Sequence, residues 1–362
     1  MRPIGPLVKF RSFNNSPRAL LYSMNPIDPP RLHGTSLGKA RFKSRPEDFQ
    51  VEEVLGWQPS GTGEHCLLWI EKSGWNTNDV AAELARRLQI RKRQISHCGL
   101  KDKNAITRQW FSIHLPGIKS PTAEELEING IRILNITRNS RKLRRGVHRG
   151  NRFTIRLRES NFSATELETR WNHIVARGVP NYFGSQRFGR QGSNIDQALQ
   201  LAVGELEIRD RLVRGILLSA LRSFLFNAVV GQRVLDGSWD KPLVGEIYGF
   251  ADNRSIVLPE RQTGNEPERV QNGDLELTAP LWGEGALLSQ GAVKKLEHST
   301  ATQHKRIADA LTSAGLQQQR RVIRLTPISP QLEWEAPQTL LLQFELPKGT
   351  YATAIIRELI DL

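Results

Sequence analysis

The segment 97–113 constrains the fold of this chain more than any other. A glycine turn, Gly99-Leu100, is followed by Asp102 and then by a run in which residue character alternates. One side of that run carries Gln109, Phe111, Ile113 and Leu115, and the other carries Trp110, Ser112 and His114. A period of two predicts that the turn leads into a half-buried strand.

Asp102 stands out in this segment because it lies between Lys101 and Lys103. Flanking cations favour the ionised form of a carboxylate at neutral pH. On its own, however, a Lys-Asp-Lys triplet is most often a solvated turn. The local sequence therefore leaves two interpretations of Asp102 open, a structural turn residue and a functional carboxylate.

The charge balance of the 362-residue chain indicates a polyanionic partner. It has 51 Lys and Arg against 37 Asp and Glu, a net charge of +14. Such an excess favours nucleic acid. An acidic membrane surface is the competing partner, but the sequence offers no apolar stretch of spanning length and no basic amphipathic anchor. We expect a cytoplasmic protein that binds nucleic acid and no membrane.

Motifs for other chemistries are missing from the sequence. Cys66 and Cys98 are far apart, and the eight histidines show no ligand spacing, so no metal site is predicted. There is no Walker loop, no dinucleotide fingerprint and no Gly-x-Ser-x-Gly elbow. We therefore expect neither a metal nor a cofactor. A lone carboxylate that acts as nucleophile or base at a sugar needs none.

Two segments are candidates for contact with a nucleic-acid backbone. The stretch 138–158 carries nine Lys or Arg and no acid, a density that repels itself unless phosphates neutralise it. Within it, Phe153, Ile155 and Leu157 alternate with arginines, which predicts a strand with one cationic face. The second segment, 178–190, interleaves aromatics, glycines and arginines, as base stacking or a packed loop would require. The predicted backbone contacts are Arg144, Arg145, Arg187 and Arg190.

Periodicity predicts most of the regular elements. Strands are expected near 49–54, 66–71, 153–157 and 339–346, and helices at about 76–88, 163–176, 305–314 and 352–362. Residues 195–235 should be largely helical, and 240–290 should hold short strands and loops. Residues 1–33 lack periodicity, and we expect a flexible arm there, with Met1 or Met24 as the natural start.

Several separated segments carry a resemblance to one family. Residues 99–110 resemble the signature of the TruD family, the tRNA pseudouridine-13 synthases. Further similar segments follow the family's order, at 45–49, 150–153, 180–184, 187–189, 222–227 and 351–358. The resemblance runs from about residue 33 to residue 362 and is weakest over 236–325. A purely structural turn at Asp102 would not predict the other motifs, so the resemblance favours a functional Asp102.

The resemblance implies an α+β chain with a pseudouridine-synthase fold. That fold has a mixed, largely antiparallel sheet with flanking helices. The catalytic domain would comprise residues 34–177 and 326–362, and a second α/β domain would be inserted at 178–325. RNA would lie in the basic cleft between them.

The resemblance also implies a role for each site residue. Asp102 would act on the ribose of the target uridine, either by attack at C1′ or by proton abstraction to a glycal, and the freed uracil would rejoin through C5. Phe153 would stack on the uracil and Asn151 would position it. Lys43 would keep Asp102 ionised. Phe49 and Tyr351 would line the pocket, although the family often has Phe at position 351.

The expected function is that of an isomerase, a monomer that converts uridine 13 of tRNA to pseudouridine. The main alternative is a non-catalytic protein that binds or folds tRNA on the same fold. An RNA methyltransferase would need a Gly-rich loop after a first strand, and none is visible.

Overall fold

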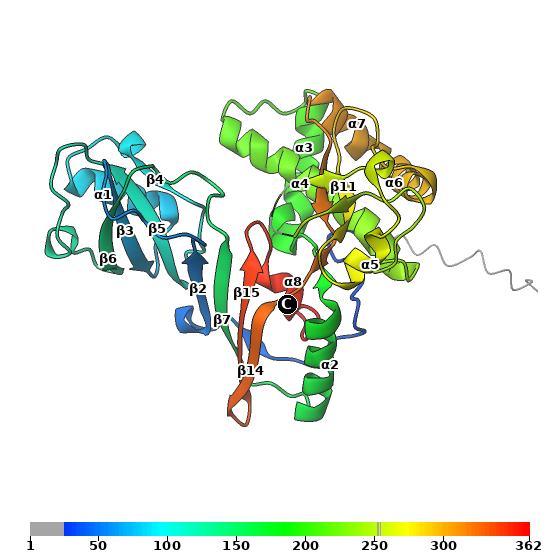
Figure 1. Cartoon of the computed structure of the whole chain (residues 1–362), viewed down its shortest axis with the longest axis horizontal. Coiled ribbons are helices and arrows are strands. Elements are labelled where there is room, and N and C mark those ends of the chain that lie inside the picture. Colours follow the sequence, from blue (N-terminus) through cyan, green and yellow to red (C-terminus); the bar gives the residue numbers. More distant parts are fainter. Residues whose placement is uncertain (1–24, 252, 254) are drawn as a thin grey trace, which may run out of the picture.

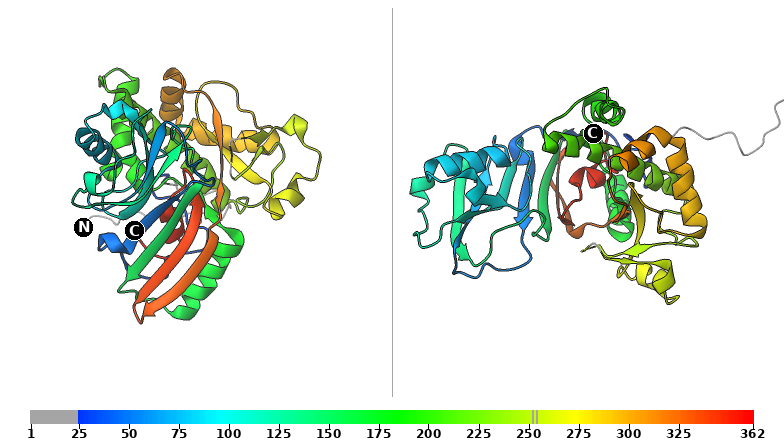
Figure 2. Two further views of the ribbon diagram at one scale, coloured as in Figure 1. Left: turned by 60° about the vertical axis from the view of Figure 1, so that its left-hand side comes forward. Right: turned by 90° about the horizontal axis from the view of Figure 1, so that it is seen from above.

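The computed structural model describes residues 25–251, 253 and 255–362, which form two lobes (Figure 1). The sheet lobe, residues 34–177 and 326–362, is built on one large sheet. The helical lobe, residues 178–325, consists mainly of helices beside a small sheet. Figure 2 shows the two lobes from two further sides. The first 24 residues of the predicted flexible arm lie outside the described part of the chain.

The large sheet follows the order β14-β15-β7-β2-β5-β3-β6, with β1 beside β7 and β4 beside β5. Its pairs are antiparallel except β2 and β5, which are parallel, so the sheet is mixed and largely antiparallel as predicted. The strands are β1 Arg41–Phe42, β2 Phe49–Val54, β3 His65–Lys72, β4 Ile95–His97, β5 Ile106–His114, β6 Ile131–Asn139, β7 Gly150–Arg158, β14 Ile328–Ala336 and β15 Thr339–Pro347.

Helices cover the large sheet in two places. Helix α1, Thr77–Arg87, packs its Val80 and Leu84 stripe on β3 and β5, because these side chains recur at helical spacing. Helices α2, Ala164–Arg177, and α8, Ala352–Ile356, cover β7 and β15 through Trp171 and Ile355. The N-terminus of α2 is capped by Ser163, whose side chain accepts a hydrogen bond from Glu166 N.

The helical lobe surrounds the long helix α4, Arg211–Leu235. Its small sheet has the order β10-β9-β11-β12. The lobe's core includes Phe188, Leu221, Phe226, Leu277 and Leu311. The other elements of this lobe are α3 Ser193–Ala202, α5 Glu266–Gln271, α6 Gly291–Gln303, α7 Lys305–Ser313, β9 Tyr248–Gly249, β10 Ile256–Val257, β11 Glu276–Leu281 and β12 Gln319–Val322.

Helix α4 is long and apolar enough, by length and composition, to cross a membrane. This corrects the expectation that the sequence has no stretch of spanning length. However, 61% of its most apolar window is buried inside the protein. Its Asn227 and Arg233 are buried and hydrogen-bond to Phe183 N and Glu246. These are properties of a helix in a protein core, which combines apolar packing with satisfied polar groups.

The chain passes between the lobes at one short pair of strands. Strand β8, Val179–Pro180, leads into the helical lobe, and β13, Arg324–Leu325, leads out of it. The two strands pair antiparallel, with Val179 opposite Leu325. The predicted domain boundaries, 178 and 325, lie at this pair. A domain with adjacent entry and exit points is compatible with an insertion into another domain.

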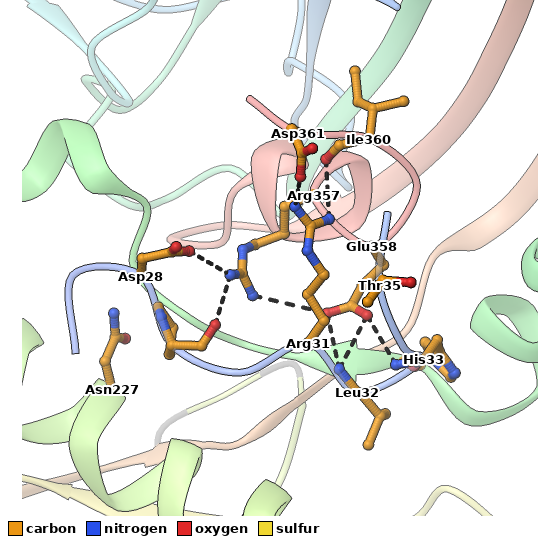
Figure 3. A network of polar contacts seen from close by, with 12 residues as sticks. Asp28, Arg31, Leu32, His33, Thr35, Asn227, Arg357, Glu358, Ile360 and Asp361 are labelled. Carbon is orange, nitrogen blue, oxygen red and sulfur yellow. Dashed lines mark hydrogen bonds and ion pairs between the residues drawn. The ribbon is translucent and has the colours of Figure 1, made fainter. Parts of the chain in front are cut away.

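The described part of the predicted arm, residues 25–33, is held against the C-terminal segment rather than free (Figure 3). Leu32 N and His33 N donate hydrogen bonds to the buried Glu358 carboxylate, at 3.1 and 3.0 Å. Arg31 reaches Ile360 O and Asp361, and Arg357 reaches Asp28. The partners lie more than 300 residues away in the sequence, so local periodicity could not reveal these contacts.

Further elements differ from the sequence expectation. Strands β6 and β14 and helix α6 were not predicted, nor were the shorter elements β4, β8, α5, β12 and β13. Helix α8 ends at Ile356 instead of 362, and Ile360 instead forms a parallel bridge with Gly38. The long-range hydrogen bonds of Glu358 and Ile360 compensate for the loss of further helical turns there.

Candidate active site

An open cavity of about 760 Å³ lies where the two lobes meet. This is within the range of ~300–1,000 Å³ that is usual for ligand pockets. All six predicted pocket residues line it, although they come from distant parts of the chain. They are Lys43, Phe49, Asp102, Asn151, Phe153 and Tyr351. Further lining residues include Thr77, Leu100, Lys101, His148, Gln186 and Thr353.

Asp102 is half-buried and held by two hydrogen bonds. Lys43 Nζ lies 2.7 Å from Oδ2, and Asn104 N donates to Oδ1 at 3.0 Å. Partial burial alone would raise the pKa of Asp102, but these two hydrogen bonds and the charges of Lys43 and Lys72 lower it below its ordinary value. The carboxylate is therefore ionised at neutral pH.

Lys43 reaches Asp102 from a strained backbone. Its φ is +56°, a left-handed conformation that residues other than glycine seldom adopt. Its Nζ lies 2.7 Å from Asp102 Oδ2 and 3.9 Å from the centre of the Phe49 ring, where a cation is attracted to the π face. Such strain persists only where surrounding contacts hold it, and it clusters at functional sites.

Buried side chains fix the loop that carries Asp102. Lys72, at the end of β3, is 1% exposed and donates from Nζ to the backbone oxygens of Trp75, at 2.7 Å, and Asp102, at 3.0 Å. Thr77 Oγ1 accepts from Lys101 N at 2.9 Å and donates to Gln109 Oε1. The loop's backbone is thus tied to β3, α1 and β5.

A buried ion pair completes the support. Lys101 Nζ lies 2.8 Å from Glu53 Oε2, and both side chains are nearly inaccessible to solvent. The second Glu53 oxygen accepts from Trp110 N at 3.2 Å. Cys98 donates a hydrogen bond to the same carboxylate, and burial raises the pKa of its thiol. Because Lys101 precedes Asp102, this pair fixes the loop next to the carboxylate.

Glu53, Cys98 and His148 are also the one buried group within the described ranges that could hold a metal ion. Their ligand atoms lie within 4.8 Å of one another. Lys101 and Trp110 N already occupy the Glu53 carboxylate. A cation would have to displace the Lys101 ammonium, since two like charges cannot share one buried carboxylate cheaply. The donor set therefore suits a hydrogen-bonded cluster better than a metal site.

Aromatic rings form the apolar wall of the pocket. Phe153 lies between Phe49 and Phe344, with ring centroids 6.0 and 5.8 Å away. This spacing follows from register, because Phe153 pairs with Val51 of β2 and with Phe344 of β15. The pocket therefore presents a stacking surface on the same side as the Asp102 carboxylate.

Asn151 contributes a polar group beside this wall. Its Oδ1 is buried and has no hydrogen-bond partner among the residues that the structure describes. The preceding Gly150 lets β7 approach β15 closely, since a Cβ there would lie 2.3 Å from Leu346 O. An unused amide in a pocket wall is suited to the hydrogen-bonding edge of a base.

The helical lobe reaches the pocket through arginines. Arg187 donates a hydrogen bond to the Tyr351 hydroxyl, which a Phe at this position could not accept. Arg321 lies 4.4 Å from the Phe183 ring centre and donates to Gly349 O at 2.9 Å. Neither arginine has an ion pair in the part of the chain that the structure describes. Arg187, Arg190 and Arg321 are not themselves among the lining residues, to which the helical lobe contributes Gln186.

The arginines of the basic strand β7 are paired with carboxylates, contrary to the prediction. Arg152 and Arg156 of β7 pair with Glu345 and Glu335, at 2.7 and 2.8 Å, and Arg158 pairs with the buried Asp48 at 2.7 Å. Carboxylates of neighbouring strands, not phosphates, neutralise this face, so the self-repulsion argument is wrong for β7. Arg144 and Arg145 lie in the preceding loop, are exposed and have no such partner among the described residues.

The comparisons with known proteins agree with this geometry. The family model of tRNA pseudouridine synthase D (TruD) matches residues 33–199 and 202–359. The chain belongs to this family. Two tRNA pseudouridine synthase D proteins are 44% identical to it, one from Pseudomonas syringae pv. syringae over 335 residues and one from Stutzerimonas stutzeri over 336. Each alignment covers 92% of this chain, with 94% and 96% of the respective relatives.

A solved structure shows the shared fold. The crystal structure of a candidate tRNA pseudouridine synthase D from Methanosarcina mazei superimposes with a TM-score of 0.66 at 20% identity, over 94% of this chain and 96% of that one. The predicted pseudouridine-synthase fold is therefore confirmed. As a TruD family member, the chain is a tRNA pseudouridine synthase and so an isomerase.

Lys72, Glu53 and His148 were not predicted from the sequence. For Lys72 and Glu53, the periodicity of their strands already indicated a buried position. Glu53 falls on the same side of its strand as Phe49 and Val51, and Lys72 falls with Leu68 and Ile70. A charged residue in an apolar alternation predicts a buried ion or hydrogen bond. His148 had no comparable signal, because it follows an irregular loop.

Proposed function

We propose that this protein converts uridine 13 of tRNA to pseudouridine, with Asp102 acting on the ribose of that uridine. The observation that carries the proposal is the ionised Asp102 held by Lys43 next to the Phe49–Phe153 wall. A carboxylate can attack C1′ or abstract a ribose proton only in its ionised form, and the base must be held while its bond to the sugar is broken.

Each neighbour has a role in this chemistry. The target base leaves its stack to enter the pocket, and Phe153 stacks on it. Asn151 offers its free amide oxygen to the uracil N3–H. Lys43 and the fixed loop keep Asp102 ionised and aimed at the ribose. The uracil, detached at N1, turns against the aromatic wall and bonds to C1′ through C5. This step releases the Asp102 ester or returns the abstracted ribose proton, and the proton lost from C5 is balanced by one gained at N1. Phe49 and Tyr351 confine the uracil during this step.

The RNA is held by charge outside the pocket. With a net charge of +14 the protein attracts phosphates, and Arg144, Arg145, Arg187 and Arg190 are the proposed backbone contacts. We further propose a cytoplasmic monomer that needs neither metal nor cofactor. The alternative of a non-catalytic tRNA-binding protein predicts the same binding surface but no need for an ionised Asp102.

The Asp102→Asn variant tests the proposal. It should bind tRNA with unchanged salt dependence and form no pseudouridine, measured by chemical labelling of position 13. Asp309→Asn is a matched control, because Asp309 is exposed and, among the described residues, forms an ion pair only with Lys305. Normal turnover by Asp102→Asn would refute the assigned role, and absence of labelling with the wild type on any tRNA would favour the binding protein.

A further inference from the structure

A second open cavity, of about 630 Å³, lies on the sheet lobe at the end of β5 opposite Asp102. We call it the basic groove. It is lined by His65, Arg91, Arg93, Gln94, Ser96, His114 and Lys142. Asp102 precedes β5, and His114 is the last of its nine residues. At ~3.3 Å per residue, β5 separates His114 from the Asp102 end of the strand by about 25–30 Å.

The cations of the groove have no carboxylate partners within the described ranges. Arg91, Arg93 and Lys142 are exposed and make no ion pair there. By contrast, Arg86 and Arg87, a few residues earlier, both pair with Glu83. The exposed Glu64 pairs with the lining residue His114 at 3.3 Å. The groove therefore concentrates positive charge that the protein itself does not neutralise.

A loop connects the basic groove to the active-site pocket. Lys142 lines the groove, and His148, six residues later, lines the pocket. Six residues span at most ~20 Å. Between them, the buried Leu143 anchors the loop while Arg144 and Arg145 point to solvent without ion pairs in the described structure. Unpaired cations thus continue from one cavity toward the other.

The chemistry of the groove favours a polyphosphate strand. Its lining contains no large apolar side chain, whereas a surface that binds lipid inserts apolar residues beside its cations. A concave site with several unpaired guanidinium and ammonium groups suits phosphates at regular spacing. We infer that the basic groove binds the sugar-phosphate backbone of the same tRNA whose uridine enters the pocket. This inference rests on the proposed function, because it needs tRNA as the substrate.

The triple variant Arg91→Ala/Arg93→Ala/Lys142→Ala tests the inference. Its Kd for a full-length tRNA transcript should rise about tenfold or more at physiological salt, and the slope of log K against log salt should fall by about 2 to 3, because about three fewer phosphates are contacted. The control Arg86→Ala/Arg87→Ala/Arg132→Ala removes the same charge from arginines that are paired with Glu83 and Glu71. It should change Kd less than threefold.

A short hairpin that carries the target uridine sharpens the test. Its stem is chosen too short to extend from the pocket to the basic groove, so the triple variant and wild type should bind it equally. An equal loss on hairpin and full-length tRNA, or an equal loss in the control, would overturn the inference. Thermal unfolding checks that each variant is folded. Pseudouridine labelling with the wild type reports on the proposed function separately, since the groove can fail while position 13 is still modified.

Discussion

Lys72 donates a hydrogen bond from its buried Nζ to the backbone oxygen of Asp102, at 3.0 Å. The side chain has no carboxylate in direct contact among the described residues, and its other acceptor is Trp75 O. A buried cation without an adjacent counter-ion is costly, and it is retained where its charge or position serves a purpose. Here Lys72 fixes the backbone of the loop, while Lys43 holds the Asp102 carboxylate.

Replacing Lys72 should impair activity more than stability. In Lys72→Met the Asp102 carbonyl loses a charge-assisted hydrogen bond worth about 1.5–3 kcal/mol, so kcat should fall roughly tenfold to hundredfold. The free energy of unfolding should change by less than about 1 kcal/mol, because a buried charge is removed and its volume is kept. Single-turnover rates and urea unfolding measure the two effects. A loss of stability that accounts for the lost activity would contradict a positioning role.

Activity should also fall as the pH rises through about 8. Burial lowers the pKa of Lys72 from 10.5 to about 8, with a further contribution from Lys101 and an opposing one from Asp102. Above that pH Lys72 is neutral and no longer supports the Asp102 charge. Wild-type rates between pH 6.5 and 9.5 should show this falling limb, and Lys72→Met should lack it.

The same shift predicts a pH-dependent difference in stability. Between about pH 8 and 10.5 the unfolded chain binds more protons at Lys72 than the folded chain. Stability therefore rises with pH in this window, relative to Lys72→Met. Melting temperatures of the two proteins at pH 7, 9 and 10 measure the difference. A constant offset across these values would mean that Lys72 titrates normally.

Tyr351 should matter through its hydroxyl as well as its ring. Tyr351→Phe keeps the aromatic face but removes the acceptor for Arg187. Since this contact joins the helical lobe to the pocket, KM for tRNA should rise about threefold to tenfold while kcat changes little. Arg187→Met should raise KM at least as much, because Arg187 is also a proposed backbone contact, and combining it with Tyr351→Phe should add nothing further. Additive losses would show that the two residues act independently.

A buried ion pair should contribute more to the stability of the helical lobe than an exposed one. Arg233 Nη1 lies 2.8 Å from Glu246 Oε2, and both side chains are 1% exposed. Glu246→Ala leaves the guanidinium without its counter-ion, at a cost of about 3–5 kcal/mol. Glu207→Ala breaks the exposed pair with Arg209 and should cost no more than about 1 kcal/mol. Denaturant unfolding of both variants measures the difference.

Sequence periodicity predicted the elements that bury one face, because burial of one face leaves a regular apolar pattern in the sequence. Strand β5 and helices α1 and α2 show the expected alternation or stripe, since one face of each is buried. The six pocket residues came from the family resemblance, and the structure brings all six to one cavity. Their individual roles stay predictions.

The remaining features depend on partners that are distant in sequence. The charges of β7 looked unneutralised because Asp48, Glu335 and Glu345 come from other strands. Whether an arginine contacts an acid or a phosphate is decided by strand order, which periodicity does not encode. The contact of Arg187 with Tyr351 likewise depends on how the two lobes meet.

Strand β15 has a consequence for synthesis of the protein. It pairs with β7 along nine residue pairs, and Tyr351 follows it in the pocket wall. A ribosome makes Asp102, Phe153 and the whole helical lobe before it makes this strand. The nascent chain therefore carries its carboxylate for most of translation without a closed pocket, and it can first isomerise a uridine after β15 and Tyr351 have left the exit tunnel.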